Sequence, residues 1–266
     1  SFGQQWFENW LAETAKISLR QAKALMRQEV VPNDTTPVDL SLYFKTNKRD
    51  AVKWPPDGTV GVSREVQAEG SAYLAGRGIP PEVAEKYGVV YSVRDRRVVF
   101  PIVMDGACYG YQGRAIDKVD DALKMRNSEG IRRNMMLMFW DMVPYGGDLV
   151  VVEGPVDAIK FHMAGGAVAT MGKQVSDEQV RLMLKKEPKR VFLGLDDDAQ
   201  EESSKLQNKI MGSEVYTIEP PPSARERCAA KGKKADFGEC TFEECAVALK
   251  LAKKRDLWKI PFNIGE

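Results

Sequence analysis

The chain has 266 residues, of which 43% are hydrophobic and 29% charged, and its formal net charge is +1. This content supports two domains, or one domain with appendages, and it excludes a uniformly basic surface, so any contact with nucleic acid must use a local patch. The four cysteines form no Cys-x-x-Cys pair, and the single histidine, His162, lies far from the last three, so we expect no zinc site in this chain. The absence of a secretory signal and of a membrane-length apolar run predicts a cytoplasmic protein with no membrane partner.

Residues 1–62 are expected to form N-terminal helices and a linker. Apolar and aromatic residues spaced four apart predict helices within residues 2–29. Residues 30–62 contain several prolines and lysines, which indicates a basic connector with little regular structure. A solvated linker and a nucleic-acid contact are both open for this segment.

Residues 63–145 are expected to form a basic α+β subdomain. Glycines and prolines break residues 64–88 into two short helices. Residues 97–104 form a strand-like run, and Asp105-Gly106 is a typical hairpin turn before a return strand at 107–115.

Residues 146–222 alternate between strand and helix patterns, which predicts an α/β domain with a parallel sheet. Apolar strands are expected at 149–153, 167–171, 191–195 and 215–218. Helices are expected to begin near Pro155, to be capped by Ser176, and to cover residues 199–210. A C-terminal helical segment is expected over residues 223–266.

Two of these strands stop at carboxylates. Glu153 ends the first, and Asp196 and Asp198 follow the third, pointing to one side if the chain stays extended. Ligands bind at the carboxyl ends of parallel strands, so these acids are expected to converge on a hard cation, Mg²⁺ or Mn²⁺. Asp157 lies in the first turn of the next helix, where capping the helix is the alternative to binding a metal.

The two acidic segments, residues 149–158 and 191–198, resemble the TOPRIM fold, which is shared by DnaG-type primases, topoisomerases and some nucleases. The resemblance implies that Glu153, Asp196 and Asp198 hold divalent metal and act as the catalytic residues in phosphoryl transfer. The TOPRIM resemblance alone does not choose between these enzymes.

The order of several further segments resembles DnaG-type primases specifically. These are residues 73–79 (Tyr-Leu-Ala-Gly-Arg-Gly-Ile), 97–102, 110–114 (Gly-Tyr-Gln-Gly-Arg) and 124–128 (Lys-Met-Arg-Asn-Ser). Residues 234–237 resemble a late acidic motif of the same family, which implies Asp236 as a further metal ligand. A fold of TOPRIM type, preceded by a basic α+β subdomain and followed by a helical tail, is therefore expected.

Basic and polar side chains near these motifs are candidates for binding the nucleotide or the template. They are Arg96, Arg97, Arg114, Lys124, Arg126, Asn127, Ser128 and Lys173. Arginine suits bidentate contact with phosphate and lysine a point-charge contact. An ordinary solvated basic face is the alternative.

The resemblance implies the RNA-polymerising core of a DNA primase, which makes short primers from ribonucleoside triphosphates on single-stranded DNA with two ions of Mg²⁺ or Mn²⁺. It also implies a replicative helicase as partner. We expect a bacteriophage protein that acts in the bacterial cytoplasm and lacks its zinc-binding domain in this chain. A TOPRIM-type nuclease and a non-catalytic nucleic-acid binding module are the alternatives.

Overall fold

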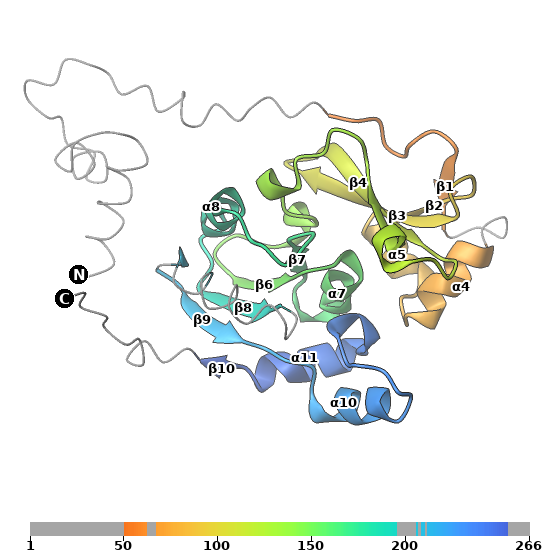
Figure 1. Cartoon of the computed structure of the whole chain (residues 1–266). Coiled ribbons are helices and arrows are strands. Elements are labelled where there is room, and N and C mark those ends of the chain that lie inside the picture. Colours follow the sequence, from red (N-terminus) through yellow and green to blue (C-terminus); the bar gives the residue numbers. More distant parts are fainter. Residues whose placement is uncertain (1–50, 63–67, 196–205, 207–208, 211, 255–266) are drawn as a thin grey trace, which may run out of the picture. The chain divides into compact units, whose positions relative to one another are not determined.

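The computed structural model describes residues 51–62, 68–195, 206, 209–210 and 212–254. All of them belong to one compact unit, Ala51–Glu266. These residues form two five-stranded sheets with helices around them (Figure 1). The helices expected within residues 2–29, and most of the helix expected at 199–210, lie outside the described residues.

The first sheet is antiparallel, with strand order β1-β2-β3-β4-β5. Its strands are β1 (Thr59–Gly61), β2 (Val90–Ser92), β3 (Arg97–Met104), β4 (Ala107–Ala115) and β5 (Met125–Asn127). The predicted β3–β4 hairpin is confirmed: Asp105 and Gly106 have φ of 52° and 77°, the positive values that a two-residue hairpin turn requires. β1 lies in the segment expected to be an irregular connector, and β2 and β5 were not predicted.

Short helices connect and support this sheet. The two predicted helices are present as α4 (Ala68–Gly76) and α5 (Pro81–Lys86), and a single turn, α6 (Asp121–Lys124), precedes β5. Two 3₁₀ turns, η2 (Arg133–Met135) and η3 (Trp140–Met142), lead to the second sheet. Gly70 of α4 lies against the ring of Tyr91, where a Cβ would come within 2.7 Å of the ring carbon Cγ, so α4 packs directly on β2.

The second sheet has strand order β10-β9-β8-β6-β7. Its strands are β6 (Asp148–Val152), β7 (Ala167–Ala169), β8 (Arg190–Gly194), β9 (Glu214–Thr217) and β10 (Lys253–Lys254). β6 to β9 pair in parallel, as predicted from their apolar runs, and β10 adds an antiparallel edge strand that was not predicted. Val152 lies opposite Gly194 in this register, so β6 and β8 end at the same edge of the sheet.

The helices of the second half are α7 (Pro155–Lys160), α8 (Asp177–Lys185), α10 (Pro222–Ala229) and α11 (Phe242–Lys250), with 3₁₀ turns η4 (His162–Ala164) and η6 (Phe237–Glu239). Ser176 caps α8 as predicted, because its hydroxyl accepts a hydrogen bond from the Gln179 amide at 3.1 Å. α7 ends at Lys160, and His162 lies in η4. Buried side chains of both sheets form one hydrophobic core, and the domain boundaries expected at residues 63, 146 and 223 stay predictions.

Candidate active site

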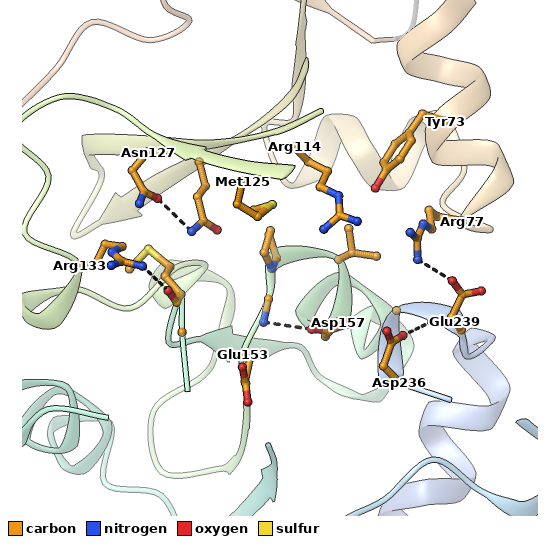
Figure 2. Close-up of a pocket in the computed structure, with 17 residues that line it drawn as sticks. Tyr73, Arg77, Arg114, Met125, Asn127, Arg133, Glu153, Asp157, Asp236 and Glu239 are labelled. Atoms are coloured by element: carbon orange, nitrogen blue, oxygen red, sulfur yellow. Dashed lines mark hydrogen bonds and ion pairs between the residues drawn. The ribbon is translucent and has the colours of Figure 1, made fainter. Parts of the chain in front are cut away.

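A cavity of about 410 Å³ is lined by residues of the first sheet, of the segments that follow β6 and β7, and of η6 (Figure 2). Its lining residues are Tyr73, Arg77, Gln112, Arg114, Met125, Asn127, Arg133, Glu153, Gly154, Pro155, Val156, Asp157, Met171, Gly172, Asp236, Gly238 and Glu239. Five of them were expected as site residues from the sequence: Arg114, Asn127, Glu153, Asp157 and Asp236. The volume lies within the range of about 300–1,000 Å³ that is usual for ligand pockets.

The junction of β6 and α7 places two carboxylates at the cavity. Asp157 Oδ2 accepts a hydrogen bond from the Gly154 amide at 3.0 Å, which caps the first turn of α7. A Cβ at Gly154 would lie only 2.7 Å from the same oxygen, so a larger residue at this position would displace the Asp157 carboxylate. Asp157 is therefore a helix cap, the alternative considered from the sequence, and it also lines the cavity beside Glu153.

Two more carboxylates reach the cavity from η6. Asp236 Oδ1 accepts a hydrogen bond from the Glu239 amide at 2.9 Å and so caps this turn. A Cβ at Gly238 would lie 2.9 Å from Asp157 Oδ1 and 3.3 Å from Asp236 Oδ1. The carboxylates of Asp157 and Asp236, far apart in sequence, thus converge around Gly238.

Arginines balance this negative charge. Arg77 Nη1 donates to Glu239 Oε1 at 2.9 Å, and both side chains are about three-quarters buried, at 25% and 22% exposure. Arg114 enters from β4 and stands between Tyr73 and Met125 in Figure 2. The cavity therefore combines carboxylates with guanidinium groups, the composition that a site for phosphates and a divalent cation requires.

The loop after β7 forms another wall and is fixed by Arg133. Met171 has φ of 63°, an unusual value for a residue with a side chain. Arg133 Nη1 donates to the Met171 carbonyl at 3.0 Å, and the Met171 amide donates to the Glu153 carbonyl at 2.9 Å. Arg133 therefore acts, through Met171, on the backbone that carries Glu153.

Several lining residues were not identified from the sequence as site residues, namely Tyr73, Arg77, Gln112, Arg133 and Glu239. Tyr73 and Arg77 lie inside the primase-like segment 73–79, which was a usable signal. Arg133 follows the Asn-Ser motif closely, and its cationic side chain was a weaker signal. Nothing local in the sequence indicates Glu239, because its partner Arg77 is 162 residues away.

The other expected binding residues do not line this cavity; they are Arg96, Arg97, Lys124, Arg126, Ser128 and Lys173. Arg96 forms ion pairs with Asp117 at 2.7 Å and with Glu69 at 2.8 Å. Arg97 donates to the carbonyls of Gly113 and Leu123, and burial lowers the pKa of its guanidinium. These two arginines hold neighbouring segments of the first sheet in place.

Asp196 and Asp198 follow β8 in sequence but lie outside the described residues. Among the residues that the structure describes, no group of three or more histidine, cysteine, aspartate or glutamate side chains is arranged to hold a metal ion. The oxygen donors of Glu153, Asp157 and Asp236 nevertheless have the chemistry that hard divalent cations prefer. In the same described segments, no helix has both the length and the apolar character needed to cross a membrane.

Comparison with known proteins identifies the fold. Residues 150–214 match a family model described as Toprim-like. A DNA primase of Deinococcus radiodurans is 31% identical over 157 residues, which cover 54% of this chain and 27% of that protein. The chain therefore spans about a quarter of the length of this curated relative.

Solved primase structures share the architecture. The RNA polymerase domain of Mycobacterium tuberculosis DnaG superposes with a TM-score of 0.56 at 15% identity, covering 73% of this chain and 79% of that domain. A DnaG primase catalytic domain bound to single-stranded DNA gives 0.55 at 16% identity, covering 73% and 74%. The resemblance inferred from the sequence is confirmed: the chain carries a Toprim-like domain within the fold of a DnaG primase catalytic core.

Proposed function

We propose that this chain is the RNA-polymerising core of a DNA primase, which joins ribonucleotides on a single-stranded DNA template. The observation that carries the proposal is the cavity in which Glu153 and Asp157, from the segment that follows β6, lie with Arg114 of β4. Nucleotidyl transfer requires carboxylates for a cation together with positive groups for phosphates. The DnaG-type fold supports the same assignment.

The carboxylates divide into two groups in this proposal. Glu153, Asp196 and Asp198 hold Mg²⁺ or Mn²⁺, since their strands leave the same edge of the second sheet. Such ions, when bound, neutralise charge on the attacking and leaving oxygens of the transferred phosphate. Asp157 and Asp236 keep their capping hydrogen bonds and add negative potential that favours cation binding.

The basic residues bind the substrates. Arg114 is the residue of the first sheet best placed to contact a phosphate, because it lines the cavity together with Asp157. Arg77 lines the same cavity but shares its charge with Glu239. Arg126 is exposed on β5, beside the cavity-lining Asn127, where it is available to a template strand. The partners proposed are single-stranded DNA, ribonucleoside triphosphates and a replicative helicase, and the proposed origin is a bacteriophage.

The test incubates the chain with single-stranded DNA, labelled ribonucleotides and Mg²⁺ or Mn²⁺. New RNA supports the proposal; loss of the input DNA indicates a nuclease, and neither product indicates a binding module.

The Arg114→Gln variant tests whether Arg114 contacts the phosphates of the ribonucleotide. The variant is expected to lower kcat/KM for ribonucleotides by about 10- to 100-fold, the value of a hydrogen bond to a charged group. Arg132→Gln is the matched control, because Arg132 is exposed and does not line the cavity. Equal activity of the Arg114→Gln variant and the control would contradict the role of Arg114.

A further inference from the structure

We propose that Gln112 and Asn127 form a recognition edge that binds one nucleobase in the cavity and sets a base preference. The proposal deepens the proposed function and rests on it for the identity of the ligand as a nucleotide. Gln112 and Asn127 lie directly opposite each other on β4 and β5, and both line the cavity.

The hydrogen bonding of this pair is incomplete. Gln112 Nε2 donates to Asn127 Oδ1 at 3.0 Å. The Gln112 side chain is buried, with the residue only 4% exposed, and its Oε1 atom has no hydrogen-bond partner. Buried polar atoms are nearly always paired in folded proteins, so an unpaired acceptor at a cavity indicates a partner that binds there.

The pair offers a defined pattern to such a partner. Because the amide of Gln112 is held by Asn127 Oδ1, Gln112 Oε1 remains as an acceptor and Asn127 Nδ2 as a donor. No hydrogen bond from Asn127 Nδ2 to any other described residue is found. An acceptor beside a donor is the complement of a nucleobase edge, and carboxamides are the side chains that commonly read such edges.

The rest of the cavity suits the remainder of a nucleotide. Met125 and Met171, which also line the cavity, supply apolar surface that a base can contact. Figure 2 shows Asn127 and Arg133 at one end and Tyr73, Arg77 and Glu239 at the other. The sugar and phosphate of a base held by Asn127 and Gln112 would extend toward Arg114, which stands between Asn127 and the end that holds Arg77 and Glu239.

A second buried polar atom without a hydrogen-bond partner also indicates that a ligand binds in this cavity. The Tyr73 hydroxyl is buried and has no hydrogen-bond partner, and Tyr73 lines the end of the cavity that holds Arg77 and Glu239. The two unpaired atoms thus lie on residues of the same cavity, one on β4 and one on α4. The base can belong to a ribonucleotide or to the DNA template, since both present the same edges.

The test measures binding without turnover. Affinities of the wild-type chain are determined for each of the four ribonucleoside triphosphates, and separately for four homopolymeric DNA oligonucleotides. Gln112→Met keeps the length of the side chain but removes its hydrogen bonds, and Gln174→Met, at an exposed glutamine outside the cavity, is the matched control.

We expect one base to bind best, and the Gln112→Met variant to weaken that ligand about two- to tenfold while leaving the weakest ligand unchanged. A changed preference among the triphosphates assigns the edge to the incoming nucleotide, and one among the oligonucleotides assigns it to the template. Asn127→Leu, which removes the carboxamide of Asn127 without adding charge, is expected to have the same effect. Equal binding of all bases by the wild-type chain, or an unchanged preference in both variants, overturns the inference.

The same proteins distinguish this inference from the proposed function. Base preference that is lost in the variants, in a chain that makes no RNA, supports the recognition edge and contradicts primase activity. RNA synthesis with the same base preference in wild type and variants supports primase activity and contradicts the recognition edge.

Discussion

Replacing Gln179 by methionine tests how the wall of the cavity is supported. Gln179 is 1% exposed on α8, and its Nε2 donates to the carbonyls of Met136 and Thr170, both at 2.9 Å, and of Arg133 at 3.1 Å. Its Oε1 accepts from the Ser176 amide at 3.1 Å. One side chain thereby joins the cap of α8, the turn η2 and the residue before Met171.

The expected cost follows from the partners that are left behind. Methionine has a similar volume, so the change creates little cavity and removes mainly hydrogen bonds. Leaving a buried polar partner unpaired costs about 1–3 kcal/mol, and the partners of one side chain are not additive. With Thr170 2% exposed and Met136 4% exposed, we expect a loss of about 2–4 kcal/mol of unfolding free energy.

Urea denaturation of the Gln179→Met variant measures this loss as a lower midpoint at unchanged slope. Lys185→Met on the exposed face of the same helix is the control, with an expected change within about 0.5 kcal/mol. A Gln179→Met variant as stable as the control would show that the bridging hydrogen bonds contribute nothing to stability.

Two further perturbations test the packing and the ion pairs. Gly194→Ala is expected to cost about 1–3 kcal/mol, since the new Cβ would lie 2.7 Å from Phe237 Cε2 and 3.2 Å from Ile218 Cδ1; a urea midpoint equal to that of the wild type would contradict it. The pKa of Glu69 lies below its ordinary value of 4.5 because Arg96 and Tyr91 donate hydrogen bonds to it, and the pKa of Asp117 lies below 3.8 because of Arg96. These carboxylates stabilise the fold above their unfolded pKa values, and that stability is lost as pH falls through the lower folded values. As the pH is lowered past about 4.5, the melting temperature should therefore decrease, and it should decrease less steeply in the Arg96→Leu variant. Identical pH profiles of the two proteins would show that the ion pairs of Arg96 do not contribute to stability.

The parts of the fold that were predicted carry strong local patterns. The β3–β4 hairpin has two long strands and an Asp-Gly turn, and the parallel strands are apolar runs bounded by glycine, proline or charge. β2 and β5 have three residues each, and β10 has two. Such short strands form because a neighbouring strand offers hydrogen bonds, which no local pattern records.

The lining of the candidate cavity could be predicted from the sequence where it depends on the ends of strands. Glu153 and Asp157 were identified because the junction of strand and helix has a recognisable order in sequence. The sequence did not show which arginines are used inside the fold. Arg96 and Arg97 looked equivalent to Arg114, but contacts with residues at least 16 positions away engage them elsewhere.

RNA synthesis by the Glu153→Gln variant on single-stranded DNA with Mg²⁺ tests most directly whether this cavity is the active site. The substitution keeps the shape of the side chain and removes its charge, so binding of the cation is weakened while the fold is preserved. Glu226→Gln, at an exposed position on α10 outside the cavity, is the control. We expect RNA from the wild type and the control, and a loss of about 100-fold or more in Glu153→Gln. RNA synthesis by Glu153→Gln at the rate of the control would contradict the assignment of this cavity as the active site.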